Sequence, residues 1–173
     1  MSDAARIREL LGGDGEIARD EVRRWMASDD LPTLAALYVL LEKASARITP
    51  ELELDEMTAL MRRYLLRCIE EDPPRTDGVH GGFEAAWTLS ACMKQWRKIA
   101  GSDKIVRDTI SALKSLYRRS DETTRNRVLC GVLEHALEDP ALRPFFGDWQ
   151  RNRELREAHK LALEWGIAHE EDV

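Results

Sequence analysis

The chain has 173 residues, of which 43% are hydrophobic and 34% are charged, with only 10 glycines and 6 prolines. This composition predicts a compact, helix-rich protein, and the length suffices for one domain or one short repeat array with its own core. The formal net charge is −6 at pH 7. We therefore do not expect the molecule as a whole to be attracted to nucleic acid or to an anionic membrane.

The sequence also predicts the compartment. The longest near-apolar run, residues 34–41, is far too short to span a bilayer, and the N-terminal residues lack the basic and apolar regions of a secretory signal. The three cysteines, Cys68, Cys92 and Cys130, are widely separated and lie in apolar stretches. That setting is typical of reduced thiols packed as small hydrophobic side chains. We expect a cytoplasmic protein without a membrane segment.

Helix signals recur along the whole chain and strand signals are almost absent, which predicts an all-α fold. The first expected helices cover about residues 4–11, 16–27 and 30–46, and Asp30 supplies an N-cap for the third. The helix that opens at Thr49-Pro50 has the clearest pattern. Six apolar residues between Met57 and Cys68 are spaced three and four apart, so they lie on one face.

The longest loop is expected over residues 70–78, because the consecutive prolines Pro73 and Pro74 cannot continue a helix. The helix that follows extends to about residue 99. It carries Phe83 and Trp87 on one stripe, and an adjacent stripe is also apolar. A helix apolar over so much of its circumference is expected to be central, with Trp87 among the most buried residues.

Further helices are expected over about residues 102–119 and 122–137, with a short one near 141–146 and a last one over 151–165. Because most of the turns have two to six residues, helices adjacent in sequence must pack antiparallel. The sequence thus predicts one domain of eight or nine helices arranged as stacked antiparallel hairpins. A short N-terminal helix and linker (1–14) precede the hairpin array (15–166), and an acidic tail (167–173) follows it.

Hairpins that open near Gly15, Pro50, Ser102 and Asp139 are separated by 35, 52 and 37 residues. The outer two spacings, the prolines near the start of a first helix (Pro50, Pro140) and the aspartates at turns resemble the HEAT and armadillo class of α-solenoids. The resemblance covers the hairpin array. It implies a scaffold that presents a surface to a partner, and it transfers no catalytic residue. The 52-residue middle unit departs from the regularity of that class, so an irregular helical bundle is the alternative.

Sequence motifs for catalysis are missing. The chain contains no phosphate-binding loop, no His-Glu-x-x-His pair and no nucleophile elbow. None of the four histidines has a glutamate three residues before it, as a helix-borne dimetal site requires, and there is no Cys-x-x-Cys pair. We therefore expect a protein that is not an enzyme and needs no metal and no cofactor.

Two small constellations have both a chemical and a structural interpretation. Glu134, His135, Glu138 and Asp139 cluster near a helix end, where they either bind a divalent cation or form a solvated polar face. His80 lies in the glycine-rich segment 77–82. It either contacts a ligand from a flexible loop, or the glycines there relieve a steric clash with a neighbouring helix.

Charge is distributed unevenly along the chain. Residues 94–127 contain ten basic and four acidic residues, a local net of +6, so the remainder carries −12. This basic band either binds an acidic protein surface or a phosphate backbone, or consists of solvated helix faces whose cations offset the helix dipoles. The candidate partner-binding residues are Lys94, Arg97, Lys98, Arg107, Lys114, Arg118 and Arg125.

Trp149 is the eighth candidate, because it lies in an aromatic segment between helices, residues 144–149. The segment either packs as a plug at the end of the array or exposes Trp149 as an interface anchor.

Three functional hypotheses follow. The first is a non-enzymatic helical adaptor that binds another protein through a groove or a charged face. The second is nucleic-acid or phosphate binding along the basic band, and the third is a small metal-dependent hydrolase that uses the His135 cluster.

Overall fold

The computed structural model describes residues 1–170 and confirms the all-α class. The only strands in this part of the chain are β1 (Ile17–Ala18) and β2 (Ile48–Thr49), which pair in parallel with Ile17 opposite Ile48. Neither reaches four residues, as the helical periodicity predicts. Within residues 1–170, no helix is long and apolar enough to cross a membrane.

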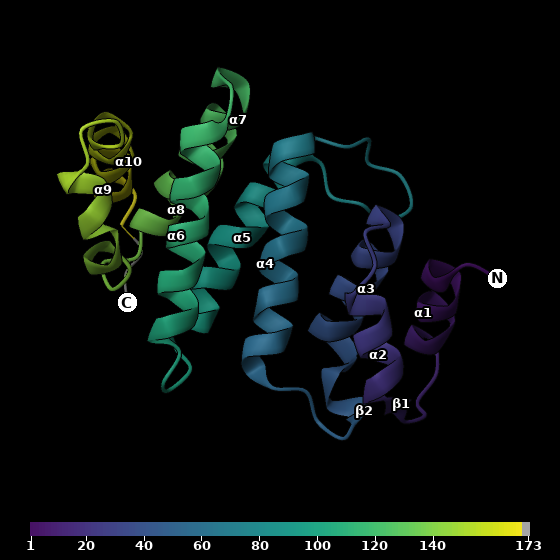
Figure 1. The fold of residues 1–173 in the computed structure, drawn as a ribbon. Coiled ribbons are helices and arrows are strands. Elements are labelled where there is room, and N and C mark those ends of the chain that lie inside the picture. The colour runs from purple at the N-terminus through teal and green to yellow at the C-terminus, as the bar shows by residue number, and fades with distance from the viewer. Residues whose placement is uncertain (171–173) are drawn as a thin grey trace. The chain divides into compact units, whose positions relative to one another are not determined.

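The chain divides into two compact units, where the sequence predicts one array. Unit 1 comprises Met1–Tyr64 and Pro73–His80, and unit 2 comprises Leu65–Asp72 and the chain from Gly81 onward. Helix α4 (Leu54–Glu71) contributes residues to both. Figure 1 labels the helices along the chain, and each unit is described separately.

Unit 1 contains α1 (Asp3–Leu11), α2 (Arg19–Met26) and α3 (Leu31–Ala44). Both α1 and α2 pack against α3. Helix α3 begins where the sequence predicts, because the Asp30 carboxylate accepts the Thr33 backbone N–H at 2.9 Å. Its apolar residues from Leu34 to Leu41 are largely buried, so α3 forms the centre of this unit.

The described part of unit 2, up to residue 170, contains six further helices: α5 (Gly82–Trp96), α6 (Asp103–Arg119), α7 (Glu122–Asn126), α8 (Glu134–Leu137), α9 (Gly147–Arg151) and α10 (Arg156–Ala168). A π-helical segment, Arg127–Leu133, joins α7 to α8, and a 3₁₀ turn, Arg143–Phe146, precedes α9. Helix α5 packs against the π-helical segment and α8, and α10 packs against α8 from another side (Figure 1). Helix α8 thus packs against both α5 and α10.

Arg127 fixes the start of α5 within unit 2. Its buried guanidinium donates to the carbonyl of Ile69 at 2.7 Å, at the end of α4, and forms an ion pair with Asp72 at 3.4 Å. A Cβ atom at Gly82 would lie only 2.6 Å from Arg127 Cδ. This contact supports the steric interpretation at Gly82, the first residue of α5, whereas a Cβ atom at Gly78 would meet nothing within 4 Å. Asp72, the residue before Pro73, has φ 45° and so lies outside the right-handed helical region.

The prediction that Trp87 is among the most buried residues is wrong. The Trp87 side chain is 54% exposed, whereas Leu89 and Met93 on the adjacent stripe of α5 are fully buried. The physical reason is that small residues, Ala85 and Ala86, bring the adjacent stripe into close contact with the rest of unit 2. Helix α5 is therefore central on one side and open on the other.

Trp149 is wrong as a partner-binding residue, because its side chain is 0% exposed. It packs edge-on against Tyr117 and Phe146, with ring centroids 5.6 and 6.2 Å away. The aromatic segment therefore forms the plug that the sequence offered as the alternative.

None of the three cysteines forms a disulfide within residues 1–170, in agreement with the sequence, but they are not equally buried. Cys68 is fully buried, whereas Cys92 and Cys130 are partly accessible. Burial, followed by the charge of Glu134, raises the pKa of the Cys130 thiol above its ordinary value. Partial exposure of Cys130 thus does not make it a reactive thiolate.

Candidate functional site

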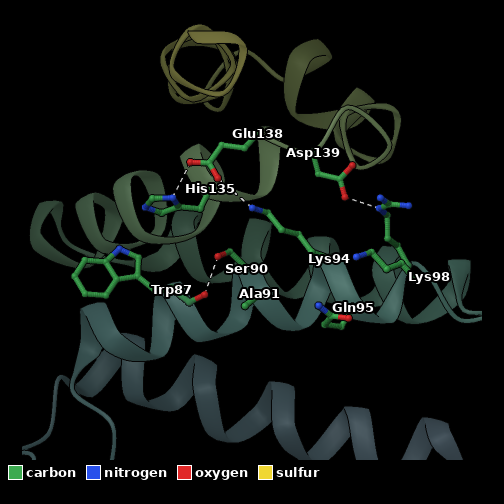
Figure 2. A pocket seen from close by; sticks show the side chains of 10 residues that line it. Trp87, Ser90, Ala91, Lys94, Gln95, Lys98, His135, Glu138 and Asp139 are labelled. Carbon is green, nitrogen blue, oxygen red and sulfur yellow. Dashed lines mark hydrogen bonds and ion pairs between the residues drawn. The ribbon is translucent and has the colours of Figure 1, made fainter. Parts of the chain in front are cut away.

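A groove lies between α5 and the end of α8, entirely within unit 2, and has a volume of about 860 Å³. We call it the α5–α8 groove. Its lining residues are Trp87, Ser90, Ala91, Lys94, Gln95, Arg97, Lys98, His135, Glu138 and Asp139. Figure 2 shows Trp87 at one end of the groove and Lys98 toward the other. Pockets of this size hold ligands of drug size or a short peptide.

The π-helical segment positions the α8 side of the groove. Its wider turns include Gly131, where a Cβ atom would lie 2.4 Å from the Ala86 side chain. The glycine therefore permits the close approach of α5. The chain then continues into α8, and His135 and Glu138 lie beside α5. π-Helical turns inside α-helices occur frequently at functional sites.

Glu138 connects the two sides of the groove. Its carboxylate accepts from Lys94 Nζ at 3.0 Å and from His135 Nδ1 at 2.9 Å, as Figure 2 shows. Burial by itself would raise the pKa of Glu138, but the hydrogen bonds and charges of Lys94 and His135 outweigh it and lower the pKa. Glu138 is therefore ionised at neutral pH and holds both partners in place.

The hydrogen bond to Glu138 also determines which ring nitrogen of His135 carries a proton. An ionised carboxylate accepts hydrogen bonds and donates none, so Nδ1 of His135 carries a proton. In the neutral imidazole, Nε2 is then an acceptor. The side chain is 35% exposed. His135 therefore offers one polar ring atom to whatever enters the groove.

The other end of the groove is cationic. Arg97 binds Asp139 through Nε, and Asp139 is almost fully buried. Lys98 is exposed and makes no ion pair within the described residues. The groove residues thus include three cations and two carboxylates. Because Lys94 and Arg97 already have carboxylate partners, Lys98 is left as the uncompensated charge.

The opposite end is aromatic. Phe83 and Trp87, one turn apart on α5, pack with ring centroids 6.1 Å apart and are 39% and 54% exposed. The Trp87 carbonyl accepts the Ser90 hydroxyl at 2.7 Å, which satisfies that buried serine. An exposed tryptophan beside a hollow surface is an anchor of the kind that dominates protein interfaces. Its exposure could not be predicted from the sequence, because helical spacing alone does not say which apolar stripe faces solvent.

Residues of the predicted basic band line more than one hollow. Lys94, Arg97 and Lys98 do come together in the α5–α8 groove. Arg107 and Lys114 instead line a separate hollow on α6, where Arg107 pairs with Asp103 at 3.8 Å and stacks over Phe145.

The remaining basic candidates have structural partners. Arg118 forms an ion pair with Glu154 at 2.8 Å. Arg125 donates to the carbonyls of Tyr117 and Arg118, and thereby caps the end of α6. Both side chains bind residues of unit 2 outside the α5–α8 groove, and neither lines the groove.

The two smaller constellations are also resolved by their contacts. Of the predicted cluster at 134–139, His135 and Glu138 interact with each other, Glu134 lies near Cys130, and Asp139 binds Arg97. No three His, Cys, Asp or Glu side chains among residues 1–170 are placed to hold a metal ion.

His80 belongs to unit 1, where its Nδ1 lies 2.8 Å from the Tyr64 hydroxyl. Its ring also packs edge-on against Tyr38 and Tyr64. These contacts tie the loop 73–80 to the core of unit 1. They favour a structural role for His80 over contact with a ligand.

Comparisons with known proteins give no relative. No family model, no curated protein and no solved structure matches the chain. The function has to be argued from the α5–α8 groove itself.

Proposed function

We propose that this protein is a non-enzymatic helical interaction module that binds a segment of another protein in the α5–α8 groove. The observation that carries the proposal is the exposure of Trp87 at the edge of that groove, supported by its neighbour Phe83. Large aromatic side chains cost free energy when exposed to water and contribute much of the binding energy when a partner covers them. We include in this proposal a HEAT-like arrangement of the helices and a cytoplasmic location, both of which are predictions from the sequence.

The polar part of the groove supports binding rather than catalysis. Glu138 is held by Lys94 and His135, and Asp139 is held by Arg97. Such a prearranged set of charges orients a ligand without leaving a carboxylate available as a general base. The groove therefore fits recognition of a polar and apolar surface.

Nucleic-acid binding is supported less well. Carboxylates from outside the band pair with its cations, namely Glu70, Asp72, Glu138, Asp139 and Glu154. A phosphate backbone would have to displace these partners, and the chain carries a net −6. We expect no binding to single- or double-stranded DNA or RNA at about 50 mM salt, measured by fluorescence anisotropy.

Selection from a displayed library of random peptides tests the proposal. Peptides enriched on the wild type are measured against Trp87→Ala and against a matched control, Trp165→Ala, which removes a tryptophan that is 40% exposed on α10. We expect Trp87→Ala to weaken binding at least tenfold and Trp165→Ala to leave it unchanged. Circular-dichroism melts confirm that both variants are folded.

Two results would overturn the proposal. One is that no peptide is enriched on the wild type, and the other is that the enriched peptides bind Trp87→Ala as tightly as the wild type.

A further inference from the structure

The α5–α8 groove has two chemically different ends. Trp87 is at one end and Lys98 is at the other, with Ala91, Lys94 and Gln95 between them. Positions 87, 91, 94, 95 and 98 recur at three- and four-residue spacing, so they follow one face of α5 and its C-terminal extension. A ligand that fits the whole groove must therefore be apolar at one end and anionic at the other.

The charge at the cationic end is available to a ligand. Lys98 is exposed and has no ion-pair partner within residues 1–170. Arg97 uses Nε to bind Asp139, so its two terminal nitrogens remain as donors at the same end. A carboxylate placed there gains two cationic neighbours. It also compensates the charge of Lys98, which has no ion-pair partner within residues 1–170.

The dimensions set the spacing of the ligand groups. Lys98 lies eleven positions after Trp87, which corresponds to about 16 Å along a helix axis. In an extended peptide, residues i and i+4 point to the same side and lie about 13 Å apart. The length of an acidic side chain covers the remaining distance. A volume of about 860 Å³ holds a few residues rather than a second helix.

The groove also provides for the backbone of such a peptide. In Figure 2 His135 lies on the Trp87 side of the groove, where its Nε2 is an acceptor in the neutral ring, and the exposed Gln95 amide offers both a donor and an acceptor. Extended peptides need such partners because their backbone groups make no internal hydrogen bonds. His135 and Gln95 therefore provide hydrogen-bonding partners for an extended chain.

We propose that the α5–α8 groove recognises a short extended peptide in which an aromatic or large apolar residue is followed, four positions later or earlier, by an acidic side chain. The apolar residue packs on Trp87 and the carboxylate binds Lys98 and Arg97. This inference rests on the proposed function and specifies its ligand. The carboxylate comes from Asp or Glu rather than from a chain terminus, because terminal carboxylates are captured by backbone N–H groups. The groove supplies side-chain cations instead.

The test uses peptide libraries that are acetylated and amidated at their ends. Each library has a fixed Phe and, four positions away on either side, a fixed Glu, Gln or Lys, with the other positions random. On the wild type we expect the Phe–Glu library to be retained about fivefold better than the Phe–Gln library, since exposed ion pairs contribute modestly. We expect this preference to decrease as salt is raised from 50 to 500 mM.

Charge reversal gives the specific control. Lys98→Glu should remove the preference for Phe–Glu and favour the Phe–Lys library instead. Lys160→Glu makes the same change at an exposed position on α10 and should have no effect. Equal retention of Phe–Glu and Phe–Gln on the wild type, with both lost on Trp87→Ala, would overturn the acidic ligand while the proposed function stands.

Two further outcomes are decisive. If neither library depends on Trp87, the proposed function fails together with the inference. If a Phe–Gln library with a free C-terminus is retained as well as the amidated Phe–Glu library, the groove binds a terminal carboxylate and the assignment to an acidic side chain is wrong.

Discussion

Trp149 and Trp87 belong to the same compact unit and have opposite environments. Trp149, from the short helix α9, is fully buried between Tyr117 and Phe146. Trp87, from the long helix α5, is 54% exposed beside a groove. The difference shows that burial follows from what packs on each side of an element. A long apolar helix can be covered on one face and open on another.

This comparison predicts the largest effects on stability. Trp149→Ala is expected to lower the free energy of unfolding by about 3–5 kcal/mol, because it leaves a cavity in a packed aromatic cluster. Trp87→Ala is expected to cost less than about 1 kcal/mol, because the side chain is half exposed. Urea denaturation followed by circular dichroism measures both values. A larger loss for Trp87→Ala than for Trp149→Ala would reverse the two assignments.

Trp149→Phe refines the first prediction. The buried indole Nε1 of Trp149 has no hydrogen-bond partner among the described residues. Phenylalanine removes this unsatisfied donor while it keeps an aromatic ring, so it should cost less than half as much as alanine.

The same contrast applies to charged residues. Arg127 is buried and donates hydrogen bonds to carbonyls at the C-terminal end of α4. Lys98, in contrast, is exposed and unpaired within residues 1–170. Arg127→Met is expected to cost about 3 kcal/mol, because it leaves Asp72 and buried carbonyls without their donor. Lys98→Glu should change stability by less than about 0.5 kcal/mol. Thermal unfolding of the two variants distinguishes them, and equal destabilisation would show that Lys98 has a structural partner.

A smaller effect depends on pH. The pKa of Glu138 is lowered in the folded protein, so the stability it contributes is fully present above the unfolded value of about 4.5 and is lost as the pH falls through the folded value. The free energy of unfolding of the wild type should therefore decrease below about pH 4.5. Glu138→Gln should be less stable at pH 7 and should show a shallower decrease. Glu164→Gln, on α10, is the control, and an identical slope for all three proteins would contradict the role of Glu138.

The sequence predicts most of the fold because helix boundaries depend on local chemistry. Asp30 caps α3 where expected, since its carboxylate accepts the backbone N–H three residues later, and Asp121 caps α7 in the same way. The consecutive prolines after Asp72 end α4 as predicted. These signals require no knowledge of the rest of the chain.

The groove could be predicted only in part, because it depends on contacts between distant segments. Lys94, Arg97 and Lys98 are close in sequence, so their clustering is visible there. The partners of Lys94 and Arg97, which are Glu138 and Asp139, are more than 40 residues away in the sequence, and no local pattern links each pair. The exposure of Trp87 depends likewise on the approach of Ala86 to Gly131. Helical spacing predicted most of the helices correctly. It also predicted that Trp87 lies on the buried side of α5, which is wrong.

The most direct test of the account follows the tryptophan indole signals by NMR while an amidated Phe–Glu peptide from the selection is added. The account predicts that the indole N–H resonance of Trp87 shifts in a saturable manner together with the ring resonances of His135, and that the resonance of Trp149 stays in place. Assignment of each indole comes from the corresponding Trp→Phe variant. A saturable shift of Trp149 with no change at Trp87 would contradict the placement of the binding site in the α5–α8 groove.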